Sequence, residues 1–333
     1  MKISRMINTV DTHTMGEPTR VVLGIPSLKG FTMVEKKEYL INKMDYFRTA
    51  LMHEPRGHRD MFGAIIAQPG FAEADFGVIF MDAGGYLNMC GHGTIGVVTA
   101  AIETGIIDST EPLTEVVMDT PAGIVTARAI VNDRRVSEVS FLNVPSFLYR
   151  GDVEIYVPKI GKLLIDISFG GSFFALVRAK DLGLAIIPEN AREFSRLGLK
   201  IRAAVNEQLE IEHPILHRIK TCDLVKFYCE PQNPEANVRN VVVFGDGQVD
   251  RSPCGTGTAA KLAALYAKGE IEKGEPFITE SILGTTFKAK IVDKQKVEVY
   301  DAVIPEITGS AYIIGLNTII IDDRDPVKHG FIL

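Results

Sequence analysis

The sequence lacks several features that would place it in whole classes of protein. Its longest apolar runs, such as residues 311–321, fall short of the ~20 residues that a membrane-spanning helix needs. The net charge is −6 and no basic stretch has interleaved aromatic residues, so a nucleic-acid partner is not expected. The N-terminal residues have no apolar segment of the signal-peptide kind. We therefore expect a cytoplasmic protein with no membrane or nucleic-acid partner.

Cysteine is also scarce, with four residues in 333: Cys90, Cys222, Cys229 and Cys254. None of them forms a C-x-x-C pair, and the seven histidines do not cluster with them at the spacing of metal ligands. Structural disulfides are not expected without a secretory signal. The sequence therefore predicts no metal site, and the cysteines are expected to be free thiols.

The composition is that of an ordinary globular protein, with 46% hydrophobic and 23% charged residues. A length of 333 residues favours two domains. Helical spacing of apolar residues predicts helices over 35–52 and 188–209, the second with Asn190 as a possible cap. Apolar runs predict buried strands over 75–82 and 240–246. Strand-like and helix-like segments alternate irregularly, which is typical of a mixed α/β (α+β) fold.

One short motif occurs twice. Cys90 begins the run "CGHGTIGVVTAAI", and Cys254 begins the run "CGTGTAAKLAALY". Each run reads Cys-Gly-x-Gly-Thr, follows an expected buried strand, and continues into an expected helix that ends near a glycine, Gly105 or Gly269. The sequence therefore predicts two related half-structures, each presenting a cysteine at the start of a helix.

A cysteine at a helix N-terminus has a definite chemistry. The helix dipole and the amides of the first turn stabilise a thiolate, which lowers the thiol pKa from about 8.5. The same amides can bind a carboxylate, and glycines let a ligand approach the backbone closely. Two such thiols suit the inversion of a stereocentre, because one group removes a proton from one face of the carbon and the other returns a proton to the opposite face.

Other interpretations of the cysteines are weaker. A thiol peptidase needs one cysteine and a histidine base, so a second equivalent cysteine would have no task. Buried apolar cysteines are the ordinary explanation for a lone thiol but not for a matched pair. Gly91, Gly93 and Gly96 also spell G-x-G-x-x-G, with Asp108 as a candidate ribose ligand. That fingerprint needs a tight turn directly after a strand, and here "AGGYLNMC" intervenes.

The sequence resembles the proline racemase family over its whole length. The resemblance is carried by "MCGHGTIG" and "DRSPCGTGTAAKLA", and supported by "DTHTMGEPTRVV", "EPRGHRDMFGA", "FGGSFFA" and "DPVKHGFIL". It implies a fold like that of diaminopimelate epimerase, in which two pseudo-symmetric halves each wrap a mixed sheet around a central helix, with the active-site cleft between them. It places 1–150 plus 307–333 in the half that carries Cys90, and 151–306 in the half that carries Cys254.

The resemblance also implies roles for individual residues. It makes Cys90 and Cys254 the two acid/base residues of a racemase that needs no metal and no pyridoxal cofactor. It implies that backbone amides hold the substrate carboxylate, and that Asp250 and the side chain of His92 lie beside the ring nitrogen. The amides are those of Gly91, His92, Gly255 and Thr256. Two purely structural alternatives stay open: Asp250 could cap the helix region, and His92 could be a packed turn residue.

Two phenylalanines bear on the substrate. Phe62 and Phe244 align with positions where proline racemases place aromatic rings against the pyrrolidine, and apolar walls would leave a ring hydroxyl without a partner. Relatives that dehydrate 3-hydroxyproline replace the second cysteine with threonine, whereas this chain has Cys254. We expect a homodimeric proline racemase. The alternatives are a 4-hydroxyproline 2-epimerase with the same two cysteines, and, from other classes, a nucleotide-dependent oxidoreductase or a non-catalytic amino-acid-binding protein.

Overall fold

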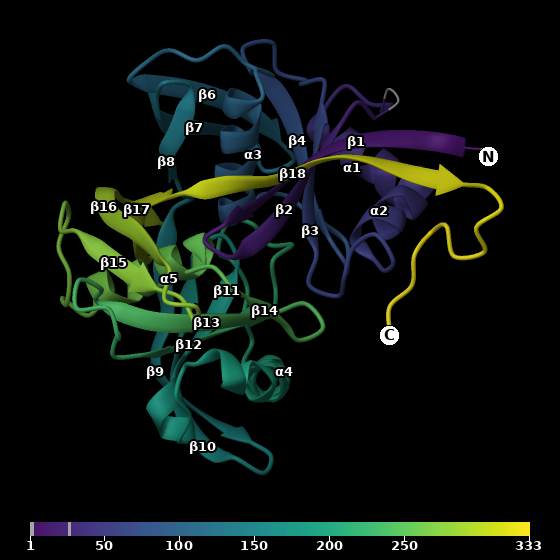
Figure 1. Cartoon of the computed structure of the whole chain (residues 1–333). Coiled ribbons are helices and arrows are strands. Elements are labelled where there is room, and N and C mark those ends of the chain that lie inside the picture. Colours follow the sequence, from purple (N-terminus) through teal and green to yellow (C-terminus); the bar gives the residue numbers. More distant parts are fainter. Residues whose placement is uncertain (1–2, 26–27) are drawn as a thin grey trace. The chain divides into compact units, whose positions relative to one another are not determined.

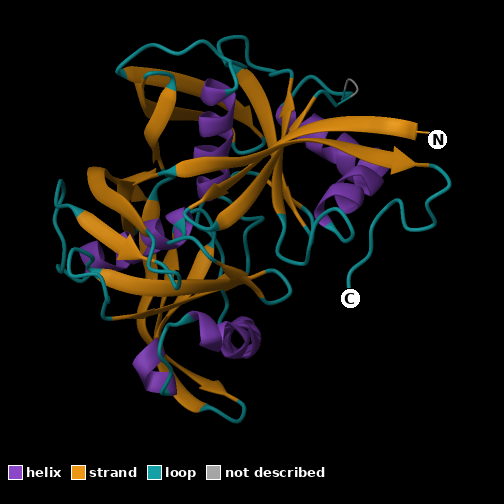
Figure 2. Cartoon of the chain, in the orientation of Figure 1, coloured by secondary structure: helices purple, strands orange, loops and turns teal. Residues whose placement is uncertain are grey.

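The computed structural model describes residues 3–25 and 28–333 of the chain. The chain divides into two compact units by its internal contacts. Unit 1 comprises the chain up to Phe141 together with Gly309–Leu333, and unit 2 comprises Leu142–Thr308. Figure 1 labels the helices and strands of both units, and Figure 2 shows that each unit combines strands with helices. The expected mixed α/β class is confirmed.

Unit 1 is built on one mixed sheet. Its strands follow in space in the order β18, β1, β2, β3, β4, β6, β7, β8. All neighbours are antiparallel except β2–β3 and β4–β6, which are parallel, and the short β5 pairs with β4. The bounds are β1 Ile3–Thr14, β2 Glu17–Leu23, β3 Phe62–Ala67, β4 Phe76–Asp82, β5 Tyr86–Leu87, β6 Leu113–Thr120, β7 Gly123–Asn132, β8 Arg135–Leu142 and β18 Ala311–Asp322.

Unit 2 closes its strands into a ring. The order is β9, β10, β11, β12, β13, β15, β16, β17, and β17 pairs back with β9 through Ala302 opposite Phe147. Here β11–β12 and β13–β15 are parallel, and the short β14 pairs with β13. The bounds are β9 Ser146–Val157, β10 Gly161–Phe169, β11 Phe173–Arg178, β12 Cys222–Cys229, β13 Val238–Phe244, β14 Gln248–Asp250, β15 Phe277–Glu280, β16 Thr286–Val297 and β17 Tyr300–Gly309.

The two units follow one plan. Reading along each sheet from β18 and from β9, the parallel and antiparallel pairings occur in the same sequence, and a short strand pairs with the fifth member of each. Helix α3 (Gly91–Glu103) follows β5, and helix α5 (Gly255–Ala267) follows β14. The internal repeat expected from the duplicated cysteine motif is therefore confirmed at the level of topology.

Each unit wraps its sheet around one buried helix. Every residue of α3 from Gly91 to Ile102 is buried, and α3 contacts β1, β2, β3, β7 and β18. Helix α5 contacts β9, β10, β11 and β16 in the same way. A helix that is apolar on all sides is stable only when it is enclosed, which is why these sequences lack an amphipathic stripe. Both helices end two residues before a glycine with positive φ, with one cap residue between them: Gly105 has φ 72° and Gly269 has φ 71°.

The outer helices are amphipathic, and they differ in detail from expectation. The single helix expected over 35–52 is α1 (Met33–Tyr39), a π-helical turn (Leu40–Met44) and α2 (Asp45–Met52). In Figure 1 these helices lie on the face of the sheet of unit 1 opposite α3. Helix α4 (Ala191–Gln208) has Asn190 at its N-cap position, but the Asn190 side chain makes no cap bond and donates instead to the Ala185 carbonyl at 2.8 Å. The expectation of an Asn190 side-chain cap was wrong, because the 3-10 turn Pro188–Asn190 gives the backbone a helical approach to α4.

Within 3–25 and 28–333, none of the helices combines the length and apolar character needed to cross a membrane.

Candidate active site

Cys90 occupies the N-cap position of α3 in unit 1. Its Sγ accepts a hydrogen bond from the Gly93 amide at 3.4 Å, and Nδ1 of His92 lies 3.3 Å from the same sulfur. The side chain is buried, with 8% of the residue exposed. Because an imidazole can hold or accept a proton near neutral pH, Cys90 and His92 form a thiol–imidazole pair on one helix turn.

Cys254 occupies the same position at the start of α5 in unit 2. Its Sγ accepts a hydrogen bond from the Gly257 amide, also at 3.4 Å, and the Thr256 hydroxyl stands 3.8 Å away where unit 1 has His92. Its backbone has φ +62°, a left-handed conformation that residues other than glycine rarely adopt. Such strain amounts to about 1–3 kcal/mol and is concentrated at functional sites.

The first turn of each helix offers amides to an anion. Gly255 and Thr256 are the first two residues of α5, and Gly91 and His92 are the first two of α3. Helix geometry provides no intrahelical acceptor for amides in this turn, and the positive end of the dipole favours a negative charge there. Each cysteine therefore stands beside a position suited to a carboxylate.

The glycines of the motif have a second function that sequence reasoning missed. A Cβ on Gly93 would lie 2.8 Å from the Phe80 ring, and a Cβ on Gly257 would lie 3.0 Å from the Cys254 sulfur. A Cβ on Gly96 would lie 2.8 Å from Oγ1 of Thr12 on β1. These residues are glycines because the helix start packs against the sheet and the thiol at very short range. All three motif glycines of unit 1 lie inside α3, not in a turn before it, so the dinucleotide interpretation is wrong.

His92 is packed against an aromatic ring. Its imidazole meets the Phe62 ring edge-on with centroids 4.4 Å apart, and both residues are buried. The backbone at the start of α3 is also held by the Thr14 hydroxyl, which donates to the His92 carbonyl at 2.8 Å. The structure thus brings together Cys90, His92 and Phe62 within unit 1.

Asp250 ends β14 four residues before Cys254 and is 6% exposed. Its Oδ1 accepts a hydrogen bond from the Ser252 amide at 2.8 Å, and the Ser252 hydroxyl accepts one from the Cys254 amide at 3.1 Å. The carboxylate therefore shapes the turn that delivers Cys254. It does not cap α5 directly, because the cap position belongs to the thiol.

Phe244 is the last residue of β13 and is half-buried. It lies on the same face of the strand as Val242, since side chains alternate along a strand, and Val242 packs in one cluster with Cys254. Unit 2 thus groups Cys254, Asp250 and Thr256, with Phe244 on the adjoining strand. The other two cysteines, Cys222 and Cys229, stand at the two ends of β12, and all four cysteines are free thiols.

The expected lowering of the thiol pKa does not hold for Cys254. Its pKa is raised to about 12, chiefly by burial and also by the nearby Asp250 carboxylate, and the charge of Lys226 and the bonds at the helix start only partly oppose this. Desolvation of a thiolate outweighs the dipole of one helix at this site. Cys254 is therefore a thiol near neutral pH and can donate a proton.

This protonation state predicts a pH-dependent reactivity. We expect alkylation of Cys254 by iodoacetamide to be slow at neutral pH and to rise about tenfold per pH unit through pH ~9, because only the thiolate reacts. An ordinary thiol with a pKa of about 8.5 levels off in that range. Mass spectrometry of the Cys254 peptide after timed quenching measures the rate. A plateau below pH ~9 would contradict the assignment.

Sequence reasoning also missed Lys226, a fully buried lysine in the middle of β12. The signal was present as a single charge in the run "LVKFY", between the buried residues Val225 and Phe227.

Within the described parts of the chain, no group of three or more histidine, cysteine or acidic side chains could hold a metal ion.

Comparisons with known proteins agree with this architecture. The family model described as proline racemase matches residues 9–332. A protein named proline racemase from Clostridioides difficile is 60% identical over 334 residues, covering 100% of both chains. A second of that name, from Acetoanaerobium sticklandii, is 56% identical over 333 residues and 99% of both chains. A hydroxyproline epimerase structure from Agrobacterium vitis, with bound trans-4-hydroxy-L-proline, superimposes with a TM-score of 0.90 at 33% identity, over 100% of this chain and 97% of that one.

The family match and the full-length similarity to proteins named proline racemase identify an isomerase of the amino-acid racemase and epimerase type. The chain belongs to the proline racemase family.

Proposed function

We propose that this enzyme interconverts L- and D-proline by proton transfer at the α-carbon, with Cys90 and Cys254 as the two acid/base groups. The observation that carries the proposal is the topological equivalence of the two thiols. Each is the N-cap of the buried helix of its unit, with its sulfur on the amide of the third helical residue at 3.4 Å. The 60% identity to a protein named proline racemase supports proline as the substrate.

The reaction needs one thiolate and one thiol. The thiolate removes the α-proton as the bond electrons move into the substrate, and the thiol on the opposite face returns a proton to the same carbon. The net charge of the pair is unchanged, and the two sulfurs have exchanged roles. The high pKa of Cys254 suits this chemistry, because a weakly acidic thiol gives a strong base once it is ionised.

The remaining site residues bind and orient the substrate in this scheme. The carboxylate is held by the first-turn amides of both helices, at Gly91 and His92 and at Gly255 and Thr256. Their hydrogen bonds also stabilise the negative charge that develops on the carboxylate during proton removal. Asp250 and the His92 imidazole bind the ring nitrogen. Phe62 and Phe244 line the pyrrolidine ring and exclude water from the reacting carbon.

Exchange in deuterated water tests the proposal. Incubation of the enzyme with L-proline should bring the optical rotation to zero while deuterium accumulates at the α-carbon of both enantiomers. A constant rotation would refute racemisation. Tight binding of proline without exchange would instead identify an amino-acid-binding protein.

A second candidate is 4-hydroxyproline 2-epimerisation by the same two cysteines. It is favoured by the structural neighbour named as a hydroxyproline epimerase, whose structure contains trans-4-hydroxy-L-proline. The apolar character of Phe62 and Phe244 favours proline over this alternative, since neither ring can bond a ring hydroxyl.

A homodimer in the cytoplasm remains part of the proposal. Strand β18 carries a row of exposed apolar side chains that a second copy could cover: Tyr312, Ile314, Leu316 and Ile320, with Met6 on the paired β1. Exposed stripes of this kind on a sheet are typical of protein–protein interfaces.

A further inference from the structure

Lys226 has an environment that structural stability does not explain. It is 0% exposed on β12, and among the described residues no hydrogen-bond partner reaches its Nζ. Burial of an amine without a partner disfavours folding unless the group is neutralised or serves another role. The pKa of Lys226 is lowered to about 8, chiefly by burial, although Cys254 and Asp250 act to raise it.

The sheet register places Lys226 in one row with Asp250. Lys226 lies opposite Val242 on β13, and Val242 lies opposite Asp250 on β14. Residues paired across neighbouring strands point to the same face of a sheet. That face is the one against α5, because Val242 packs in one cluster with Cys254 and would contact a Cβ on Gly257. Lys226 therefore extends beneath the start of α5.

Unit 1 has nothing charged in the matching row. The equivalent pairings are Ala64 opposite Phe80 and Phe80 opposite Leu87, and Phe80 would contact a Cβ on Gly93 as Val242 would on Gly257. Alanine and leucine thus stand where unit 2 has Lys226 and Asp250.

On the central helices the two units differ in the opposite sense, because there it is unit 1 that carries the nitrogen base. Unit 1 has His92 two residues after its cysteine, with Nδ1 3.3 Å from the sulfur, and unit 2 has Thr256. Each thiol therefore has one nitrogen base in its surroundings, and the two units supply it from different elements.

We propose that Lys226 is a positioning residue for Cys254, whose ammonium group stabilises the Cys254 thiolate and offsets the charge of Asp250, as His92 serves Cys90. The proposal rests on the two-thiol function proposed above. The charged and titratable groups around Lys226 are Asp250 on β14, Cys254 and Lys261 on α5, and Tyr228 on β12 itself. Within this set the Lys226 ammonium lowers the pKa of Cys254, whereas Asp250 and burial raise it.

The proton balance follows from this set. When Cys254 is the thiol that donates to the substrate, it becomes a thiolate and an ammonium group beneath it compensates the new charge. When substrate returns a proton to Cys254, that compensation is no longer required. Lys226 needs to lose no proton in either half of the reaction, so its effect is electrostatic.

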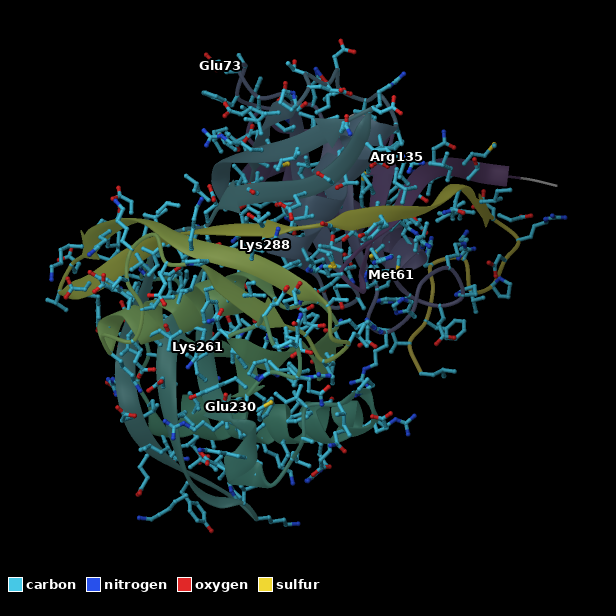
Figure 3. All side chains as sticks on the ribbon, turned by 60° about the vertical axis from the view of Figure 1, so that its left-hand side comes forward. Met61, Glu73, Arg135, Glu230, Lys261 and Lys288 are labelled. Atoms are coloured by element: carbon cyan, nitrogen blue, oxygen red, sulfur yellow. The ribbon has the colours of Figure 1, made fainter. Side chains whose placement is uncertain are left out.

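Lys261 provides a matched control. It is also a buried lysine of unit 2, on α5, and its Nζ lies over the Tyr228 ring at 4.0 Å. It lines a cavity of about 580 Å³ with residues such as Glu230, and Figure 3 labels both among the side chains of unit 2. Substitution of Lys261 removes one positive charge from the same unit and leaves Lys226, Val242 and Asp250 in place.

The first experiment measures the thiol and not the reaction. In full-length Lys226→Met, alkylation of Cys254 by iodoacetamide at pH ~7, below the pKa of about 8 of Lys226, should be at least about tenfold slower than in the unmodified protein, which corresponds to one pKa unit. Lys226→Arg should restore part of the rate, and Lys261→Met should not slow it, because loss of the Lys261 charge favours the ammonium form of Lys226. Equal profiles in Lys226→Met and the unmodified protein would overturn the proposal.

The second experiment uses racemisation, provided that the unmodified enzyme racemises proline. Lys226→Met should lower kcat at neutral pH and shift the alkaline limb of its pH profile upward, with a smaller change in KM. A lower kcat with an unshifted profile would mark a purely structural role and overturn the proposal. Thermal unfolding checks the fold, and methionine should not destabilise it because an unpaired buried amine is removed. If the unmodified enzyme shows no racemisation, the alkylation experiment still decides the role of Lys226.

Discussion

Replacement of either Cys90 or Cys254 by serine should lower proline racemisation by at least about 10³-fold, since a serine hydroxyl is neither a comparable base nor a comparable acid near neutral pH. Optical rotation with L- and D-proline measures the loss. The two variants should also differ from each other in deuterated water. In the proposed scheme each variant retains a thiol on one face of the substrate, so each should exchange the α-proton of one enantiomer only, and the two variants should act on opposite enantiomers.

The control for the cysteine variants is Cys229→Ser, at the far end of β12 from Cys222 and half-buried. It should keep the full rate. Circular dichroism and thermal unfolding should show that both active-site variants are folded. Full racemisation by either single variant, or exchange of the same enantiomer by both, would contradict the two-base scheme.

The enzyme should prefer proline to trans-4-hydroxy-L-proline by about 5- to 150-fold in kcat/KM. This range corresponds to about 1–3 kcal/mol for a hydroxyl that loses water and, in the proposed site, would meet only the rings of Phe62 and Phe244. Initial rates with both substrates measure the ratio. Replacement of Phe244 by serine should narrow the preference, because the side chain then offers a hydrogen-bond partner.

Phe31→Ser is a suitable control for that variant, because Phe31 is 89% exposed and belongs to unit 1, whereas β13 belongs to unit 2. It should leave the substrate ratio unchanged. A preference for hydroxyproline in the unmodified enzyme would assign it to the epimerase activity instead, with the same two cysteines in the same roles.

Much of the fold was predictable because its signals are local. The enclosed helices α3 and α5 were expected from the Cys-Gly-x-Gly-Thr runs and from their final glycines, and the structure confirms both within a few residues. Strands β4 and β13 were expected from short apolar runs. The π-helical turn Leu40–Met44 was not, because the residues around it keep a nearly helical spacing and nothing in the sequence marks the wider turn.

The positions of the two cysteines at helix starts were predictable, but the electrostatics around them were not. A repeated motif is sufficient to find Cys90 and Cys254. The pKa of Cys254 depends on how deeply the start of α5 is buried and on which charges lie nearby, and those are properties of the packed unit. The helix-dipole argument predicted the opposite direction, because it considered α5 alone.

The sequence by itself determined that this chain has two equivalent thiols, each at the start of a helix. Capping and periodicity are encoded within about 15 residues, and the same motif is readable at both places. Only the tertiary structure decided what surrounds those thiols. Lys226 and Asp250 are 24 residues apart in the chain, and they share a row because β12, β13 and β14 pair in one register. Register and burial arise from long-range packing, and they make the charged groups around Cys254 different from those around Cys90.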